Sequence, residues 1–202
     1  MPFDKAKFFD AVRSGLLGPT LSDDEVTGCE AILNAMEGTP ISWCAYALAT
    51  SYLETAHTMQ PVREYGGRAY YTRMYDITGQ RPLLAKANGN IHPGDGVRYC
   101  GRGYVQLTWR NNYRRLGDAL GVPLEDQPDL AMQPDIAARI MRDGMEKGRF
   151  TGKSFEHFLS PGAAQRPMFV EARRIINGRD RAGLIADYAL QFQSALQAGG
   201  WA

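Results

Sequence analysis

The sequence predicts a mainly α-helical (α+β) domain that is interrupted across its middle by one irregular stretch. Apolar residues recur at helical spacing up to about residue 60 and again after residue 108. Between these parts, residues 61–107 lose that period and are rich in glycine, proline and tyrosine. No internal repeat, low-complexity segment or linker divides the chain, so we expect a single domain over residues 1–202.

The composition excludes several classes of protein. The formal net charge is +1, which gives no electrostatic case for binding nucleic acid. The longest apolar run is too short for a membrane span, and the first residues lack the basic and apolar regions of a signal peptide. We therefore expect synthesis in a cytoplasm and no membrane insertion. Cys29, Cys44 and Cys100 lack metal-ligand spacing, which predicts three free thiols.

Three helices are expected before the irregular stretch. Residues 4–17 have helical spacing, and Ser22 to Glu25 form a capping box that opens the second helix. The third helix should run from Pro40 to about Ala56, with Thr39 as its N-cap. It is apolar on all sides, which is typical of a buried helix.

The irregular stretch is predicted to consist of loops and short strands, with a short helical piece around residues 83–86. Its aromatic content argues against disorder, and a loop region of this length in a compact domain is usually functional. Residues 99–108 should be extended. Helices then return: Thr108 should cap a helix through Leu120, further helices are expected over residues 134–148, 154–159 and 167–176, and Asp180 should cap the last one.

Two carboxylates are the first candidates for chemistry. Glu54 ends the buried helix, where a carboxylate is costly unless it is paired or neutral, and neutrality suits a general acid. Glu64 follows ten residues later in a loop, so the two groups sit in different surroundings, as an acid and a base at one glycosidic bond require. Alternatively, Glu54 is simply exposed at a helix end and Glu64 pairs with Arg63 or Arg68 on the surface.

A second cluster of candidates lies between residues 99 and 113. Gly101-Arg-Gly103 begins like a dinucleotide-binding fingerprint, but Gln106 replaces the third glycine and no long apolar strand precedes it, so we reject a nucleotide cofactor. Instead, Gln106, Thr108 and Asn112 place uncharged amides and a hydroxyl close together, which suits an N-acetyl sugar or a positioned water. Alternatively, Thr108 is only a helix cap and the asparagines are solvated.

Aromatic residues give a third set of candidates. Sugar rings have apolar faces that stack on Tyr and Trp, which makes Tyr99 and Trp109 candidates for substrate binding; packing of the loops against the core is the alternative. His57, His92 and His157 do not form a zinc pattern, and neither a G-x-S-x-G elbow nor a cysteine nucleophile motif is present. We expect no metal and no cofactor.

Several segments, in order, resemble glycoside hydrolase family nineteen, which contains the plant-type chitinases and many bacteriophage endolysins. They are residues 51–55 (Ser-Tyr-Leu-Glu-Thr), Arg63-Glu64, residues 93–108, Asn112-Tyr113 and residues 175–178 (Ile-Ile-Asn-Gly). The resemblance covers about residues 40 to 190. Its most specific part is the run Gly-Arg-Gly-Tyr-Val-Gln-Leu-Thr that ends at Thr108.

The resemblance implies a lysozyme-like fold with two helical lobes around a substrate cleft and a small irregular β/loop region. It implies inverting hydrolysis of β-1,4 bonds beside N-acetylglucosamine, for which the two carboxylates should stand roughly 6.5–9.5 Å apart. Glu54 then matches the general acid, Glu64 the base that activates water, and Thr108 the residue that helps to hold this water. Gln106, Asn112 and Asn177 match substrate-binding positions.

Departures from the family pattern concern Leu53, where the family often has His, and Cys100, which replaces a tyrosine or basic residue and is expected to affect a substrate subsite. Because the loop before Glu64 varies in length in the family, Asp76 and Asp95 are alternative bases.

The preferred interpretation is a monomeric phage or prophage endolysin that cuts peptidoglycan. It would be a single catalytic domain without a wall-binding module, held in the host cytoplasm until its release to the cell wall. The alternatives are a chitinase and a non-catalytic wall-binding protein.

Overall fold

The computed structural model describes residues 2–201 and divides the chain into two compact units. Unit 1 comprises the residues up to Gln60 and those from Met141 onward; unit 2 is Pro61–Ile140. Both units are built from helices. The only strands among the described residues are β1 (Val62–Arg63) and β2 (Arg102–Gly103). The mainly helical prediction is therefore confirmed.

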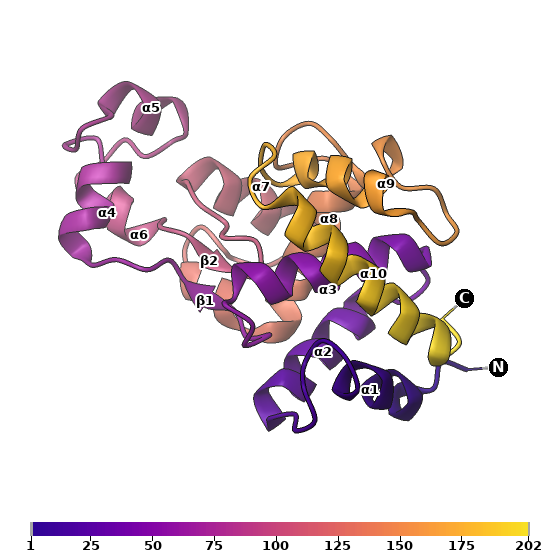
Figure 1. Ribbon diagram of the computed structural model, residues 1–202. Coiled ribbons are helices and arrows are strands. Elements are labelled where there is room, and N and C mark those ends of the chain that lie inside the picture. The colour runs from indigo at the N-terminus through magenta and orange to yellow at the C-terminus, as the bar shows by residue number, and fades with distance from the viewer. Residues whose placement is uncertain (1, 202) are drawn as a thin grey trace. The chain divides into compact units, whose positions relative to one another are not determined.

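Unit 1 is organised around α3 (Ile41–Glu54). Twelve of its fourteen residues are buried, as predicted from its apolar surface. The last helix, α10 (Ala182–Ala198), packs along α3 and also contacts α1 (Lys5–Arg13) and α9 (Arg166–Ala172) (Figure 1). The carboxylate at the end of α3 is thus carried by a helix that neighbours enclose along nearly its whole length.

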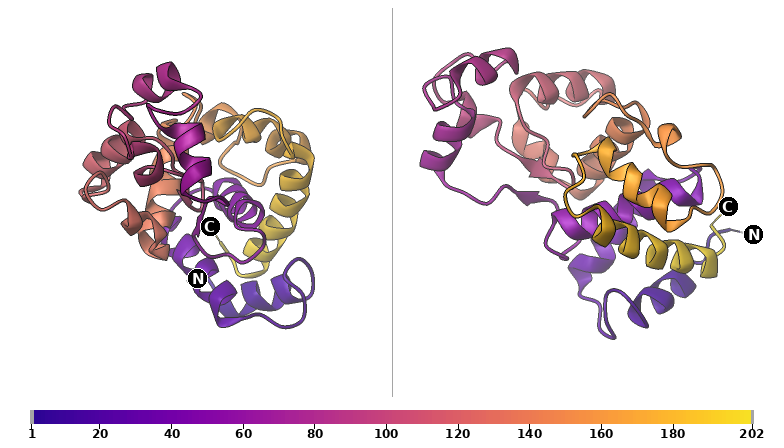
Figure 2. Two further views of the ribbon diagram at one scale, coloured as in Figure 1. Left: turned by 90° about the vertical axis from the view of Figure 1, so that its left-hand side faces the viewer. Right: turned by 45° about the horizontal axis from the view of Figure 1, so that its top comes forward.

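The first and last segments of the chain meet in unit 1 (Figure 2). The backbone N–H of Asp4 donates to Gly199 O at 2.8 Å, and the rings of Phe3 and Trp201 pack edge to face at 5.0 Å. Asp4 also caps α1, which ends at Arg13 and not at residue 17 as expected. The predicted capping box at Ser22 is confirmed at the start of α2 (Asp23–Ala35).

Close packing of α2 against the chain that leaves α3 depends on Gly28. A Cβ added to Gly28 would collide with the backbone carbonyl of Met59. We expect Gly28→Ala to lower the free energy of unfolding by about 1–3 kcal/mol or more, because backbone on both sides must move to relieve the overlap. Thermal and urea unfolding measure this change. The matched control is Gly162→Ala, where an added Cβ meets nothing within 4 Å; an equal loss in both variants would contradict the packing argument.

Unit 2 contains a two-stranded antiparallel pair in which Val62 faces Gly103 and Arg63 faces Arg102. The region expected to be mostly loops forms three short helices, α4 (Arg68–Tyr75), α5 (Pro82–Ala87) and α6 (Asp95–Arg98). The helical piece expected around residues 83–86 is confirmed as α5, whereas the loop prediction is wrong for α4 and α6, because tertiary hydrogen bonds replace the missing helical pattern. Carboxylate oxygens of Asp76, for example, accept from the backbone N–H groups of Gly94 and Gly96 at the start of α6.

Three predicted N-caps are wrong by one residue. The helices α3, α7 (Arg110–Leu120) and α10 have Pro40, Trp109 and Arg181 at their cap positions. The hydroxyls of Thr39 and Thr108 donate to the carbonyls of Met36 and Gln106, which precede them in the chain, and neither α3 nor α7 has a side-chain hydrogen bond at its N-cap. Side-chain hydrogen bonding within the preceding turn has taken precedence over capping.

The remaining elements complete both units. They are η1 (Pro128–Met132), α8 (Pro134–Glu146), η2 (Phe155–His157) and η3 (Arg173–Ile175). All three cysteines are buried free thiols, as predicted. Across residues 2–201, no helix has the length and apolar character needed to cross a membrane.

Candidate active site

Glu54 lies at the last position of α3 and is ion-paired. Arg173 Nη2 lies 2.8 Å from Glu54 Oε1, with the carboxylate side chain 23% exposed and the arginine side chain 3% exposed. A carboxylate at the end of a buried helix was expected to be either paired or neutral, and the structure shows Glu54 paired with Arg173. Sequence reasoning missed Arg173; the available signal was the arginine pair, Arg173 and Arg174, that precedes the Ile-Ile-Asn-Gly segment.

Buried polar atoms accompany this ion pair. The hydroxyls of Tyr46 and Thr50 and Nη1 of Arg173 are buried without a well-formed hydrogen bond. Burial raises the pKa of Tyr46 to about 12, although the neighbouring Thr50 hydroxyl and Arg173 act in the opposite direction. Tyr46, Thr50 and Glu54 are spaced four residues apart and therefore share one side of α3. The buried helix thus carries a polar stripe that ends at the carboxylate.

The chain leaves α3 through a strained turn. Ala56, His57 and Met59 all have positive φ values, of 51°, 73° and 56°. Thr55 braces the turn, because its hydroxyl donates to Ser51 O and accepts from the N–H of Met59. Left-handed backbone at non-glycine residues is sparsely populated and is often found beside functional groups. Here it follows Glu54 immediately.

Glu64 lies directly after β1 in unit 2 and is surrounded by neutral donors. Its Oε1 accepts from the hydroxyls of Tyr75 at 2.5 Å and Tyr70 at 3.1 Å, and its Oε2 accepts from the N–H of Gly101 at 3.2 Å. The hydroxyl of Tyr71 donates to the backbone carbonyl of Glu64. A carboxylate offers about four acceptor positions, so three donors leave one position for a further proton donor such as water. The predicted surface pairing with Arg63 or Arg68 is not found; Arg63 instead pairs with Asp129.

Gly101 brings Glu64 and Gln106 together. A Cβ at Gly101 would lie 2.8 Å from Gln106 Oε1 and 3.2 Å from Glu64 Oε2, so both side chains approach the space that only glycine leaves open. Gln106 has φ of 52°, and its amide donates to the carbonyls of Val62 and Gly103. The first glycine of the Gly-Arg-Gly segment therefore allows close packing of polar side chains.

Tyr75 is the principal donor to Glu64. Burial and the hydrogen bond to Glu64 raise the pKa of Tyr75 far above its usual value, so its hydroxyl remains a donor throughout the neutral range. We expect Tyr75→Phe to lower the free energy of unfolding by roughly 1.5–3 kcal/mol, because a hydrogen bond to a charged group contributes about that much. Thermal and urea unfolding measure this change.

The control for this variant is Tyr65→Phe, which removes the hydroxyl of a neighbouring, fully exposed tyrosine. It should leave the free energy of unfolding unchanged. An equally stable Tyr75→Phe variant would show that the hydrogen bond from Tyr75 to Glu64 does not stabilise the fold.

Thr108, Trp109 and Asn112 follow Gln106 in the same unit. Trp109 packs edge to face on Tyr75, with ring centroids 5.1 Å apart, which places its indole beside the donor to Glu64. Thr108 Oγ1 donates to Gln106 O at 2.8 Å, and Asn112 Nδ2 donates to Thr108 O at 2.8 Å. The polar cluster expected from the sequence is therefore present, although its members hold one another and the backbone.

Two expectations in this region are corrected. The ring of Tyr99 is only 1% exposed and its hydroxyl donates to Glu125 O, so it offers no face for a sugar ring. Tyr99 belongs to the core of unit 2. Cys100 is also fully buried, and burial raises the pKa of its thiol. A buried thiol does not contact a substrate, so the expected effect of Cys100 on a subsite has no support.

The alternative bases Asp76 and Asp95 are committed to local structure. Asp76 accepts hydrogen bonds from Thr78, Gly94 and Gly96. Burial alone would raise the pKa of Asp76, but these hydrogen bonds outweigh it and lower the pKa below its usual value. Asp95 is 6% exposed and accepts from the N–H groups of Ile91 and His92. Neither carboxylate is available in the way that Glu64 is.

Asn177 lies in unit 1 just beyond η3. Its N–H donates to Arg173 O at 3.0 Å, which ties this exposed residue to the arginine that pairs with Glu54. Its Oδ1 accepts from the N–H of Gly178. Among residues 2–201, no three His, Cys, Asp or Glu side chains form a group suited to hold a metal ion.

Comparison with solved structures shows the fold. Chitinase C from Streptomyces griseus HUT6037 superposes with a TM-score of 0.64 at 23% identity, covering 96% of this chain and 76% of that one. A bacterial family 19 chitinase superposes with a TM-score of 0.59 at 22% identity, covering 96% and 94% of the two chains. The chain therefore has the lysozyme-like fold of family 19 chitinases.

Sequence comparison gives short, strong matches. Endochitinase 1 of Theobroma cacao is 51% identical over 43 residues, and chitinase 11 of Oryza sativa subsp. japonica is 46% identical over 48 residues. These matches cover 21% and 24% of this chain but only 13% and 18% of those proteins. An inactive chitinase-like protein of Hevea brasiliensis is 51% identical over 35 residues, or 17% of this chain and 11% of that one. No family model matches the chain.

Proposed function

We propose that this protein is a glycoside hydrolase that cleaves β-1,4 bonds beside N-acetylglucosamine, with chitin or chitooligosaccharides as substrate. The observation that carries the proposal is the contrast between two carboxylates. Glu54 ends a buried helix beside a buried cation, whereas Glu64 is held by neutral hydroxyl and N–H donors with one acceptor position left over. Different surroundings allow one carboxyl group to act as acid and the other as base.

In this mechanism Glu54, once protonated and released from its ion pair with Arg173, gives that proton to the glycosidic oxygen of the leaving sugar. Glu64 takes a proton from a water molecule that attacks the anomeric carbon from the opposite face, which inverts its configuration. Thr108 and Gln106 assist by orienting that water beside Glu64. Arg173 stabilises the carboxylate that Glu54 becomes after it has given up its proton, and Asn112, Asn177 and Trp109 contact the sugars.

The names of the relatives support chitin over peptidoglycan, because the solved structures and the plant proteins of similar sequence are called chitinases. The endolysin interpretation draws only on the resemblance of the sequence to the wider family. Peptidoglycan also contains β-1,4-linked N-acetylglucosamine, so it is the second substrate to be tested.

The test is hydrolysis of chitin oligosaccharides and of purified peptidoglycan by the intact protein. Mass spectrometry identifies the products, and NMR of a fresh reaction identifies the anomer. We expect chitin oligosaccharides to be cut into shorter chitin oligosaccharides, and the new reducing ends to appear first as the α-anomer. Preferential cleavage of peptidoglycan would move the proposal to an endolysin. If the protein binds chitin oligosaccharides or peptidoglycan but hydrolyses neither, the non-catalytic alternative is favoured. The inactive chitinase-like protein of Hevea brasiliensis is a relative of this kind.

A further inference from the structure

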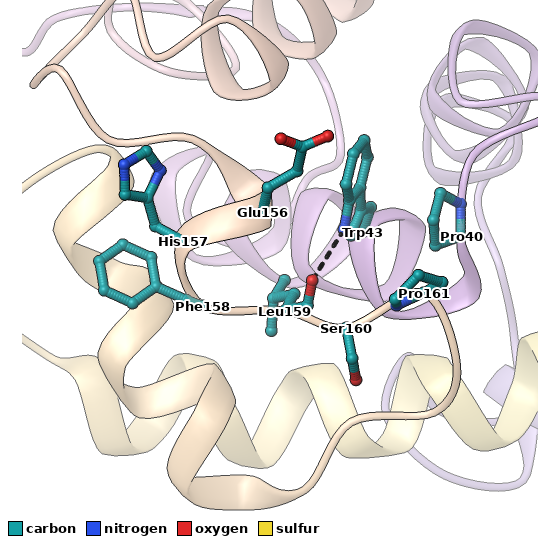
Figure 3. A pocket seen from close by; sticks show the side chains of 8 residues that line it. All are labelled: Pro40, Trp43, Glu156, His157, Phe158, Leu159, Ser160 and Pro161. Atoms are coloured by element: carbon teal, nitrogen blue, oxygen red, sulfur yellow. Dashed lines mark hydrogen bonds between the residues drawn. The ribbon is translucent and has the colours of Figure 1, made fainter.

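A groove lies in unit 1 at the start of α3, at the opposite end of the helix from Glu54. We call it the Trp43 groove. It has a volume of about 650 Å³ and is lined by Pro40, Trp43 and the segment formed by Glu156, His157, Phe158, Leu159, Ser160 and Pro161 (Figure 3). Aromatic rings and prolines thus line an open depression together with a small number of polar groups, the usual composition of a ligand site.

The walls of the Trp43 groove are fixed to each other. Ser42 Oγ donates to Ser160 O at 2.7 Å, and Trp43 Nε1 lies 3.4 Å from Leu159 O, to which it donates (Figure 3). The indole stacks on Phe155 with ring centroids 4.8 Å apart and an interplanar angle of 15°. Because Phe155 is completely buried, it covers one face of the indole, and a ligand can meet only the opposite face or the edge.

Polar groups stand beside the indole. The carboxylate of Glu156 and the ring of Trp43 point to the same side of the segment, whereas the side chain of Ser160 points the other way (Figure 3). Glu156 is exposed, and after Glu146 and Asp143 its carboxylate is one of the charges that raise the pKa of the nearby Lys147 ammonium. His157 Nδ1 accepts from the N–H of Ser154, so its proton is on Nε2, which is left as a donor on this exposed residue.

We propose that the Trp43 groove binds a sugar unit of the same glycan that the protein hydrolyses. An indole face provides an apolar, electron-rich surface for the C–H groups of a pyranose ring, and a carboxylate accepts hydrogen bonds from its hydroxyl or N-acetyl N–H groups. The Trp43 groove contains both features, the indole ring of Trp43 and the carboxylate of Glu156. The identity of the glycan rests on the function proposed above, whereas the existence of the sugar site does not.

The position of the groove suggests what it contributes. Trp43 and Glu54 are eleven residues apart on one helix, which corresponds to about three turns and roughly 16 Å. The two side chains therefore leave α3 on the same side and are held by one rigid element. A polymer that occupies the groove is kept near the acid, which raises its effective concentration there. A short oligosaccharide gains nothing from such a second contact.

The first test is binding without turnover. In the Glu54→Gln variant, titration with a tetrasaccharide of N-acetylglucosamine is followed by the indole N–H NMR signals of the three tryptophans. We expect the Trp43 signal to shift and the Trp201 signal to stay, since Trp201 Nε1 donates to Thr39 O outside the groove. Adding Glu156→Ala, which changes an exposed side chain and leaves the stacked rings in place, should weaken the Trp43 response about tenfold. A Trp43 signal that does not respond overturns the sugar site.

The second test is turnover on long and short substrates. Glu156→Ala and Trp43→Ala should each raise KM for polymeric chitin about tenfold and leave kcat/KM for the tetrasaccharide within about twofold of the parent; Glu37→Gln, on an exposed residue outside the groove, is the control. Equal loss on both substrates, or no loss on the polymer, overturns the contribution to polymer binding. If the parent hydrolyses no glycan but Trp43 still responds to the sugar, the proposed function fails and the sugar site stands.

Discussion

Replacing Glu54 with Gln should reduce hydrolysis of chitin oligosaccharides by about 10²–10⁴-fold, the contribution of a positioned general acid. Glutamine has nearly the same shape and keeps an oxygen that can accept from Arg173, but it has no proton to give to the leaving oxygen. The loss should therefore appear in kcat, while KM stays near that of the parent. Initial rates on a tetrasaccharide, measured over a range of substrate concentrations, separate the two parameters.

A structural effect of this substitution has a distinct signature. Removing the negative charge beside Arg173, which is only 3% exposed, leaves a buried cation with a weaker partner. We therefore expect a lower Tm together with the lost activity. Glu37→Gln, an exposed glutamate in the same unit, should change neither. If Glu54→Gln hydrolyses the substrate at the rate of the parent, Glu54 is not the acid and α3 is only a core helix.

The surroundings of Glu54 show how far the sequence could predict the site. Residues within one helix determine that α3 is buried and that it ends in a carboxylate, so both features followed from a local pattern. The partner Arg173 lies 119 residues further along the chain. Nothing in the local pattern around either residue states that they meet, because the contact depends on how α9 and α10 pack beside α3. Helix periodicity predicts which face is buried but does not identify the partner.

Unit 2 shows the same limit more strongly. The sequence identified an aromatic-rich, functional stretch, and the structure places Tyr70 and Tyr75 on the carboxylate of Glu64. Tyr99, which was expected to bind sugar, lies in the core instead. Without a helical or strand period, no rule assigns individual tyrosines to the core or to the site. The short helices α4 and α6 were missed for a related reason, since hydrogen bonds to distant residues stabilise them, as those to Asp76 do for α6.

Replacing Glu64 with Gln should also reduce kcat by about 10²–10⁴-fold, because an amide cannot take a proton from the attacking water. The fold should persist, since the hydroxyl of Tyr75 can turn to accept from the new amide and the N–H of Gly101 can still donate to its oxygen. We therefore expect an unchanged Tm and a nearly unchanged KM. This pattern differs from that of Glu54→Gln, in which a buried cation loses its partner.

A comparison with Asp76→Asn distinguishes the base from a structural carboxylate. Asp76 accepts four hydrogen bonds from Thr78, Gly94 and Gly96, so its replacement puts an N–H₂ group among N–H and O–H donors and should lower Tm. Glu64→Gln should instead lose activity without losing stability. If Glu64→Gln retains full activity while Asp76→Asn or Asp95→Asn abolishes it at unchanged Tm, the base is one of these aspartates. The argument from free acceptor positions would then be wrong, because a carboxylate held by backbone N–H donors would be the one that activates water.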